Sequence, residues 1–494
     1  MSASLSPVRG RLALAASPEP LSGPLQRRTK LVATLGPATD APGVLDQLVA
    51  TGLDCARLNC SHGTPADLRR RAAEVRAAAA RAGRPLALLF DLQGPKMRLA
   101  ADTAERTLAL GDTLVFSDHD GGGNRAVVDF EGFPGLVSER SEIIVSDGVP
   151  RFAVEHCDNG DVVARVVSPG RISASKGVNV TFARPDLPAI TEKDIADLAV
   201  AVEQGADFIA QSFVRNGADV QELRRRLREH GSRAGIIAKL ESAEGYENLD
   251  EILAAADGVM VARGDYGVTA GLAGIPLMQK DVIRRAARAG KIAITATQML
   301  ESMITNSEPT RAEVTDVANA VIDGTSAVML SAESSVGQHP VAAVAALSVI
   351  ANAAENSPDL RLRARTSTQQ VGTGTPAEAI MRAAVQFADD LDAAAIVVPT
   401  ATGFSARACA KYRPRQPIVA LAHDPGVAEQ LTLEWGVYPV IAEVADSLDT
   451  RVESALRVAR EFAGLRSGDR IVVTHGQQPG TPGSTNALLD LVLP

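Results

Sequence analysis

The chain has 494 residues, of which 46% are hydrophobic and 22% are charged, and its formal net charge is −9. This composition excludes disorder over most of the chain and leaves room for two or three domains. The negative charge argues against nucleic acid or an anionic membrane as a partner, because such partners bind a basic stripe.

Cysteine content and the N-terminus bear on the compartment. Four cysteines without a CxxC pair are too few for a disulfide framework and indicate a reducing compartment. Residues 1–26 contain only the short apolar run LALAA, so we predict a flexible tail there and a cytoplasmic location. The longest apolar stretch, Val341–Ala354, is too short to cross a bilayer and should form one buried helix.

From residue 27 to 355, short aliphatic runs alternate with longer segments of helical period, which is typical of βα units around a parallel sheet. The runs are LVATLG, CARLNC, LALLFDL, FIAQSF, IIAKL, GVMVARG, IAITATQ and AVMLSAE. Eight runs predict an α/β fold with a (β/α)8 TIM barrel as its catalytic part, formed by residues 27–98 and 176–355.

Two further regions are expected. The segment between the third strand and a helix starting near Thr191 is too long for a loop. Its alternating runs TLVFSD, RAVVDF, EIIVSDG and DVVARVV predict an inserted all-β domain over 99–175. After a polar connector at 356–375, the runs AAIVVPT, PIVALAH, VYPVIAE and RIVVTHG predict an open-sheet α/β domain over 376–494.

Polar residues collect where the predicted barrel strands end, which is where barrel enzymes place catalytic groups. Side chains two apart on a strand share a face, so Lys239 and Glu241 should point the same way. Neighbouring strands lie about 4.8 Å apart, so Glu241 and Asp265 can reach one ion. Two carboxylates completed by substrate oxygens and water suit Mg²⁺, and Lys239 would stabilise a transferring phosphoryl group. The other strand-end candidates are Arg57, Asn59, Ser61, Asp91 and Thr297.

Simpler interpretations exist for two of these features. Lys239 and Glu241 could form an internal salt bridge that stabilises little, but Arg57, Asp265 and Thr297 at neighbouring strand ends favour a site. Gly264 fits either a simple chain reversal or close approach of the backbone to a substrate carboxylate, and the Asp that follows favours the second.

Long segments of the chain resemble the pyruvate kinase family. They are RRTKLVATLGP (27–37), ARLNCSHG (56–63), KGVNV (176–180), LPAITEKD (187–194), AQSFVR (210–215), VARGDYGV (261–268), ATQMLESM (296–303) and PTRAEVTDVANAVIDG (309–324). The resemblance implies phosphoryl transfer from phosphoenolpyruvate to ADP, giving pyruvate and ATP. It also implies that the inserted domain is a lid, and that the chain forms a homotetramer.

Residue roles follow from the same resemblance. Lys239, Thr297 and Arg57 correspond to catalytic residues, and Glu241 and Asp265 to ligands of Mg²⁺, with Mn²⁺ as an alternative. Gly264, Asp265 and Thr297 would hold the enolate or pyruvate, and Arg57 the phosphate. The residues that resemble nucleotide contacts are Asn59, Cys60, Ser61, His62, Arg98 and Lys176.

The chain departs from the family beside a monovalent-cation site. Asn59, Ser61, Asp91 and the carbonyl of Leu92 resemble K⁺ ligands, but Lys96 stands where a Glu is common. Our hypothesis is that the Lys96 ammonium replaces the ion, so that K⁺ is not required. In the alternative, Lys96 is a surface residue and K⁺ still binds. Four further departures, which remove no group of the predicted site, are Ser242, Thr269, Ala332 and Ser334.

The C-terminal region contains a loop that resembles the family's effector loop. Thr400, Thr402, Gly403 and Ser405 follow a predicted strand and open a helix, so they could hold the phosphate of a phosphorylated effector. The same residues are equally ordinary helix caps. GTPGSTN (480–486) resembles a second part of that region.

Two other functions fit the sequence less well. A magnesium-dependent barrel lyase or aldolase acting on a pyruvate enolate would not need the lid, Lys176 or the ARLNCSHG segment. A non-catalytic metabolite-sensing paralogue would not need Lys239, Glu241, Asp265 and Thr297 together.

Overall fold

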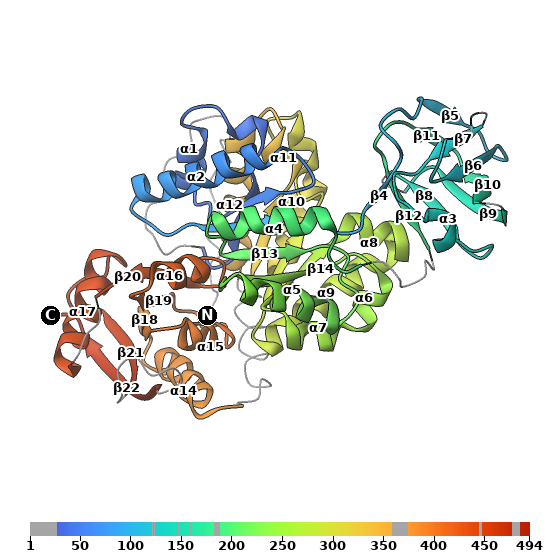
Figure 1. Cartoon of the computed structure of the whole chain (residues 1–494). Coiled ribbons are helices and arrows are strands. Elements are labelled where there is room, and N and C mark those ends of the chain that lie inside the picture. Colours follow the sequence, from blue (N-terminus) through green and yellow to red (C-terminus); the bar gives the residue numbers. More distant parts are fainter. Residues whose placement is uncertain are drawn as a thin grey trace, which may run out of the picture.

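The computed structural model describes residues 27–120, 122, 124–146, 148–158, 160–181, 188–357, 374–443, 447–476 and 485–494, without the side chains of 265, 268–270 and 272. The predicted tail over 1–26 and residues 358–373 of the predicted connector lie outside this part of the chain. Figure 1 shows three bodies: the barrel in the middle, a β domain on one side of it and an α/β domain on the other.

Eight parallel strands close into a barrel in the order β1-β17-β16-β15-β14-β13-β3-β2. The strands are β1 Lys30–Thr34, β2 Cys55–Asn59, β3 Ala87–Asp91, β13 Phe208–Gln211, β14 Gly235–Leu240, β15 Gly258–Ala262, β16 Ile292–Ala296 and β17 Ala327–Leu330. Each predicted run supplies one strand, so the predicted barrel is confirmed. The strands are buried along nearly their whole length, which explains their continuous apolar character.

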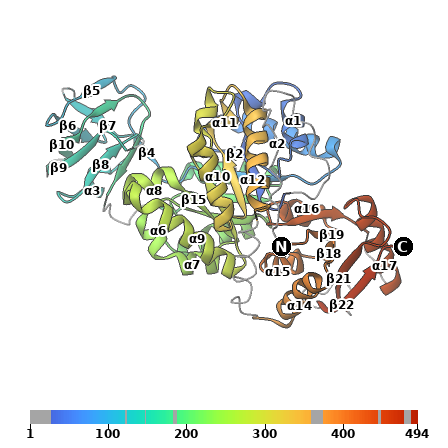
Figure 2. The same ribbon diagram turned by 180° about the vertical axis from the view of Figure 1, so that it is seen from behind.

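Helices surround the barrel (Figure 2). They are α1 Val44–Ala50, α2 Pro65–Ala82, α4 Glu192–Glu203, α5 Gly217–Glu229, α6 Ala243–Glu247, α7 Leu249–Ala255, α8 Arg263–Ala270, α9 Ile275–Ala289, α10 Arg311–Asp323, α11 Ala332–Ser335 and α12 Pro340–Glu355, with short 3₁₀ turns at Pro37–Thr39, Leu272–Gly274 and Glu301–Ile304. Capping boxes fix the start of several helices: Thr191 at α4 accepts from the Asp194 N–H, and Thr310 at α10 accepts from the Glu313 N–H. Within the described ranges, no helix has both the length and the hydrophobicity needed to cross a membrane.

The inserted domain is built on a seven-stranded sheet of order β4-β12-β8-β9-β10-β6-β7. Its elements are β4 Met97–Arg98, β5 Arg106–Leu108, β6 Thr113–Ser117, β7 Arg125–Val127, α3 Phe133–Leu136, β8 Glu142–Val145, β9 Arg151–Asp158, β10 Asp161–Ser168, β11 Gly170–Ile172 and β12 Gly177–Val180. The limits of the inserted domain remain a prediction. The seven-stranded sheet includes β4, which precedes residue 99, and β12, which follows residue 175. Where the chain leaves and re-enters the barrel, β4 and β12 pair antiparallel with each other.

The C-terminal domain has a five-stranded sheet of order β20-β19-β18-β21-β22. Its elements are α14 Pro376–Asp390, β18 Ala395–Thr400, α15 Phe404–Ala410, β19 Ile418–Ala422, α16 Pro425–Leu431, β20 Val437–Ile441, α17 Leu448–Glu461, β21 Arg470–Gly476 and β22 Thr485–Val492. The four predicted strands are confirmed, and β22 is an addition that runs antiparallel to β21. Helices α15 and α16 lie on the side that faces the barrel (Figure 2).

Candidate active site

Four charged side chains meet at the carboxyl ends of β2, β3 and β14. The Nε of Arg57 lies 2.7 Å from an Asp91 oxygen, and the Nζ of Lys239 lies 3.2 Å from the other. Lys239 also lies 3.1 Å from a Glu241 oxygen. All four side chains are buried or nearly so. The structure therefore brings together the lysine, the arginine and one carboxylate of the predicted site, with Asp91 between them.

Neighbouring groups hold this network in place. Arg57 also donates to Thr34 Oγ1 over 2.7 Å, and Lys239 donates to Ser212 Oγ over 2.6 Å. Burial alone would raise the pKa of Asp91, but the charges of Lys239 and Arg57 hold it below its ordinary value. Asp91 is therefore ionised in the fold and orients both cations.

Glu241 is the one predicted magnesium ligand whose side chain the structure describes. Its second oxygen accepts the backbone N–H of Phe213 over 2.7 Å, so the carboxylate has a fixed orientation. Asp265 lies in the first turn of α8, but its side chain is outside the described part of the structure. Among the described residues no cluster of three or more metal-ligating side chains is present. Mg²⁺ normally binds one or two carboxylates and takes its other ligands from substrate and water, so this donor set fits it.

The sixth strand ends earlier than expected, because β15 stops at Ala262 and Arg263–Asp265 begin α8. First-turn N–H groups of a helix lack intrahelical partners, and the N–H of Gly264 donates to Thr297 Oγ1 over 3.0 Å. Thr297 itself has a φ of 67°, which is unusual for a β-branched residue. The start of α8 and the unusual backbone conformation of Thr297 together bring the Gly264 N–H to the Thr297 hydroxyl.

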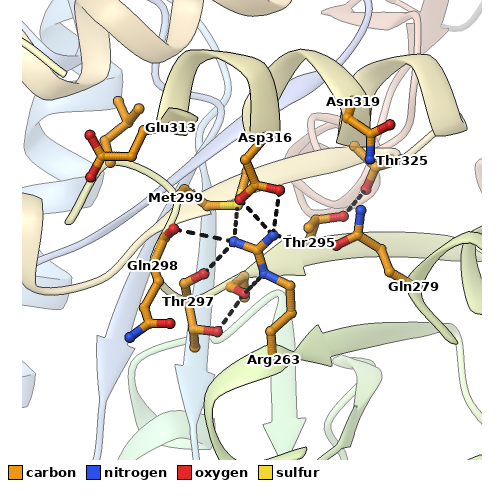
Figure 3. A network of polar contacts seen from close by, with 12 residues as sticks. Arg263, Gln279, Thr295, Thr297, Gln298, Met299, Glu313, Asp316, Asn319 and Thr325 are labelled. Atoms are coloured by element: carbon orange, nitrogen blue, oxygen red, sulfur yellow. Dashed lines mark hydrogen bonds and ion pairs between the residues drawn. The ribbon is translucent and has the colours of Figure 1, made fainter. Parts of the chain in front are cut away.

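Arg263 holds that turn in place (Figure 3). Its Nη1 lies 2.8 and 2.7 Å from the two carboxylate oxygens of Asp316 on α10. Its Nη2 and Nε donate to the carbonyls of Thr297 and Ala296 over 2.6 and 3.1 Å. Only a guanidinium can satisfy a carboxylate and two backbone carbonyls in this fixed geometry.

A cavity of about 870 Å³ opens beside this turn. Its walls include Gly264 and Thr297 from the barrel, Lys96 at the start of the inserted domain, and Gly148 and Arg151 within that domain. The inserted domain thus borders the cavity at the barrel mouth.

Comparisons with known proteins agree with this geometry. Residues 26–344 match the family model described as "Pyruvate kinase, barrel domain", and residues 378–489 match "Pyruvate kinase, alpha/beta domain". The chain is 42% identical over 473 residues to a pyruvate kinase of Geobacillus stearothermophilus, covering 94% of this chain and 80% of that protein. It is 38% identical to a pyruvate kinase of Clostridium perfringens, covering 94% of this chain and 99% of that protein.

The chain belongs to the pyruvate kinase family. Its activity is therefore that of a phosphotransferase of glycolysis. This assignment favours a kinase over the lyase or aldolase alternative.

The residues that resemble pyruvate kinase nucleotide contacts lie on two neighbouring segments. Asn59 ends β2, and Cys60, Ser61 and His62 form the turn after it, where the Ser61 N–H donates to Asn59 Oδ1 over 3.1 Å. Arg98 lies on β4 and donates to the carbonyl of Ser175 over 3.1 Å, beside Lys176. Partial burial and then the charges of Arg98, Arg57, Lys96 and Lys193 lower the pKa of His62. Cations therefore surround His62, whereas burial, followed by the carboxylates of Asp197, Asp91 and Asp194, raises the pKa of the neighbouring Cys60 thiol.

The residues that resemble the monovalent-cation site of pyruvate kinases are only partly available to an ion. Asn59 and Asp91 are opposite each other in the β2–β3 register. However, Arg57 and Lys239 occupy the Asp91 carboxylate, and the Leu92 carbonyl accepts the Ser212 hydroxyl over 2.7 Å. The Lys96 Nζ lies 5.9 Å from the centre of the Phe213 ring, and the Phe213 N–H binds Glu241. Lys96 therefore lies in the same part of the barrel mouth as the proposed K⁺ ligands.

Three departures from the usual pyruvate kinase sequence have structural roles. Ser242 is the N-cap of α6 and accepts the Gly245 N–H over 3.2 Å. Ser334 donates to the Thr34 carbonyl over 2.9 Å, and Ala332 begins α11. The side chain of Thr269 lies outside the described part of the structure.

The loop that resembles the effector loop is ordered by its own contacts. Thr400 Oγ1 accepts the Gly403 N–H over 2.9 Å, and Gly403 has a φ of 82°. Ser405 Oγ lies 2.9 Å from Thr485 Oγ1, so this loop reaches the start of β22. The Thr402 carbonyl accepts from Arg407. Residues 480–484 of the second predicted part lie outside the described residues.

Sequence reasoning missed three residues of this site. Arg263, Ser212 and Asp316 lie in the VARGDYGV, AQSFVR and PTRAEVTDVANAVIDG segments without being assigned roles. Asp316 is on a helix that follows a different strand, so only the fold could pair it with Arg263. Ser212 had a weak signal, because it directly follows strand β13 at the same mouth.

Proposed function

We propose that this chain transfers the phosphoryl group of phosphoenolpyruvate to ADP, giving pyruvate and ATP, at the carboxyl end of the barrel. The observation that carries the proposal is the buried Arg57–Asp91–Lys239–Glu241 network. Phosphoryl transfer depends on positioning and electrostatic stabilisation, and this network supplies two oriented cations beside an oriented carboxylate.

Lys239 is the proposed stabiliser of the transferring phosphoryl group. Its ammonium has three donors, which in this structure contact Asp91, Glu241 and Ser212. These contacts fix the position of the charge before substrate arrives, so little reorganisation is needed during the reaction. Arg57, held by Asp91 and Thr34, would bind the phosphate of phosphoenolpyruvate.

Mg²⁺ is the proposed divalent cation, and Mn²⁺ has the same ligand preference for carboxylates and water. Glu241 and Asp265 would hold it, and when bound it would neutralise charge on the substrate oxygens. The β14–β15 register supports this pairing, because Leu240 is opposite Val261 and the two chains leave their strands side by side.

Gly264 and Thr297 are the proposed contacts for the carboxylate and enolate of the three-carbon substrate. The Gly264 N–H and the Thr297 hydroxyl already face each other at the cavity wall. A side chain at 264 would extend toward Thr297, with an added Cβ 3.9 Å from it. Glycine therefore keeps the backbone accessible to a planar substrate.

The nucleotide phosphates would lie between the turn after β2 and the hinge of the inserted domain. Asn59, Cys60, Ser61 and His62 would present one side, and Arg98 and Lys176 the other. After burial, the charges of Arg98, Arg57 and Lys96 contribute to the lowered pKa of His62, and these cations support this placement. Closure of the lid would then bring Arg98 and Lys176 onto the nucleotide and exclude water.

Lys96 is proposed to replace K⁺. We expect turnover to change little when tetramethylammonium replaces K⁺, whereas Lys96→Glu should need K⁺ for full turnover, because the new carboxylate would recreate an ion ligand. A large loss of wild-type rate without K⁺ would favour the alternative in which K⁺ still binds.

Three other expectations remain proposals: a homotetramer, a cytoplasmic location, and a phosphorylated effector at Thr400, Thr402, Gly403 and Ser405. Light scattering of the purified chain would measure its subunit number.

A coupled assay with phosphoenolpyruvate, ADP and Mg²⁺ tests the proposed function. Pyruvate formation that requires all three is the expected result. A properly folded chain that forms no pyruvate would instead be a non-catalytic paralogue.

A further inference from the structure

Helix α4 begins within the LPAITEKD segment, none of whose residues has a role in the proposed reaction. The helix packs against α2 on the outside of the barrel (Figure 1). Two consecutive residues of its first turn, Lys193 and Asp194, each contact a different loop at the barrel mouth. The start of α4 therefore joins the loops that follow β2 and β3, and both loops contain residues of the proposed site.

Asp194 fixes the position of this helix start. One of its carboxylate oxygens accepts the Thr191 N–H and the Thr191 hydroxyl over 2.9 and 2.7 Å, as in a capping box. The other oxygen accepts the Gly94 N–H over 3.0 Å, in the loop after β3. Asp194 is buried, so water does not compete for these contacts. The backbone of the neighbouring Lys193 is therefore held at a fixed distance from the mouth.

Lys193 extends from this fixed start to the turn after β2. Its Nζ donates to the carbonyl of Cys60 over 2.6 Å and pairs with the carboxylate of Asp197, one helical turn further along α4. The Asp197 side chain is nearly buried, whereas 44% of the Lys193 side chain is exposed. Asp197 thus holds the ammonium toward Cys60, and the ammonium can be removed without opening the core.

The Cys60 carbonyl belongs to the same peptide unit as the Ser61 N–H, which donates to Asn59 Oδ1 over 3.1 Å. The Cys60 N–H donates to the Asp91 carbonyl over 2.9 Å, and the His62 N–H donates to the Asn59 carbonyl over 3.2 Å. Cys60 is buried, and a buried backbone carbonyl needs a donor, which Lys193 supplies. Without the ammonium, the peptide between Cys60 and Ser61 would be free to rotate.

We infer that Lys193 is a positioning residue for the nucleotide, because it holds the Cys60–Ser61 peptide and with it the orientation of Ser61 and His62. This role rests on the proposed function, in which the turn after β2 contacts the nucleotide phosphates. Lys193 acts through the turn and does not touch ADP. The proposed contacts of phosphoenolpyruvate at Gly264 and Thr297 follow β15 and β16, which are not neighbours of β2 in the barrel.

Calorimetric titration of the full-length protein with ADP and Mg²⁺ tests this role. Lys193→Met should raise the Kd for ADP about fivefold or more, because the turn loses a charge-assisted hydrogen bond. The Kd for phosphoenolpyruvate should stay within about twofold of the wild-type value, since distant sites respond independently. Lys193→Arg keeps a charged donor and should recover most of the affinity for ADP.

Arg69→Gln is the matched control. Arg69 lies on α2 and pairs at 2.8 Å with Glu203 at the opposite end of α4, where both side chains are exposed. This variant removes a cation from the same pair of helices but leaves the contact with Cys60 in place. It should bind ADP and phosphoenolpyruvate as the wild type does.

Hydrogen–deuterium exchange gives a readout that needs no nucleotide. The N–H groups of Cys60, Ser61 and His62 all have acceptors in this structure. Lys193→Met should speed exchange in peptides that contain this turn and leave the other barrel strands unchanged. Faster exchange throughout the barrel would mean that Lys193 only stabilises the fold, and would overturn its positioning role.

The failure of this role can be told apart from the failure of the proposed function. Wild-type protein that binds ADP, together with equal ADP affinity in Lys193→Met, would overturn the role of Lys193 alone. An equal loss of affinity for ADP and phosphoenolpyruvate would also overturn it. Wild-type protein that binds no ADP would overturn the proposed function and the role of Lys193 together.

Discussion

The two ends of the barrel use the same kinds of charged residue in different ways. At the mouth, Lys239 contacts the carboxylates of Asp91 and Glu241. At the amino end, the buried Lys30 donates to the Val437 carbonyl of the C-terminal domain over 2.6 Å and lies 4.5 Å from the centre of the Tyr438 ring.

The partners of the two lysines explain their different roles. Lys30 binds backbone and an aromatic ring of another domain, and Leu433 of that domain packs with the residues that fill the barrel interior. Lys30 also lines a cavity of about 210 Å³ between the barrel and the C-terminal domain, together with Val437 and Tyr438. Lys239 instead contacts the carboxylates of Asp91 and Glu241 and the Ser212 hydroxyl, which fix the position of its charge at the barrel mouth. The surroundings of the two buried lysines therefore differ: Lys30 joins two domains, whereas Lys239 is oriented by carboxylates at the mouth.

Removing the ammonium at each end would separate these roles most clearly. Lys239→Met should lower kcat by about 10²-fold or more, because one preorganised charge is lost. Lys30→Met should leave kcat within about twofold, since it lies at the opposite end. Steady-state kinetics of both variants measure this, with the exposed Lys280→Met as control. Equal losses of kcat in Lys239→Met and Lys30→Met would contradict the different roles expected of the two lysines.

The contacts by which Arg263 holds the turn at Thr297 can be weakened without removing a proposed substrate contact. Arg263→Lys keeps a charge near Asp316 but cannot reach the Thr297 and Ala296 carbonyls at the same time. We expect kcat to fall about tenfold with a smaller change in the KM for phosphoenolpyruvate, because the strained turn at Thr297 loses its clamp. Asp316→Asn should have a similar effect. A change confined to thermal stability would show that Arg263 has no positioning role.

The smallest expected effect is a pH dependence of stability at the amino end. Burial lowers the pKa of Lys30 from 10.5 to about 8, with the nearby Asp54 opposing and Arg27 adding to the shift. Between these values the unfolded chain retains a proton that the folded chain has lost, so Lys30 makes the free energy of unfolding rise with pH. The slope is at most about 1.4 kcal/mol per pH unit. Below pH 8 both states are protonated and the slope vanishes.

Urea unfolding of the wild type and Lys30→Met at pH 7.5, 8.5 and 9.5 measures this slope. The wild type should gain stability relative to the variant above pH 8. Parallel curves over the whole range would mean that the Lys30 pKa is not shifted.

The barrel was predictable because its strands are buried on both faces and appear as unbroken aliphatic runs between helix caps. Strand β9 was missed because its outer half, with Glu155, His156 and Asp158, is exposed and polar. Strand β22 was missed because its partly exposed residues, broken by Asp490, lack a clear buried face.

The site residues that lie at the ends of barrel strands could be predicted from the sequence. The two-residue periodicity of a strand and the order of the strands along the chain were enough to predict that Lys239, Glu241 and Arg57 lie near one another. The contacts of Arg263 with Asp316 could not, because they join the start of α8 to a helix that follows the next strand. Long-range partners of this kind depend on how helices pack around the barrel, which local sequence does not encode.

Binding of Mn²⁺ to the full-length protein, followed by electron paramagnetic resonance, tests most directly whether the mouth is the metal-dependent catalytic end. Glu241→Gln should weaken Mn²⁺ binding at least about tenfold, because an ionised ligand becomes neutral. Glu244→Gln, three residues later on an exposed position, should bind Mn²⁺ as the wild type does. Wild-type affinity in Glu241→Gln would contradict the account.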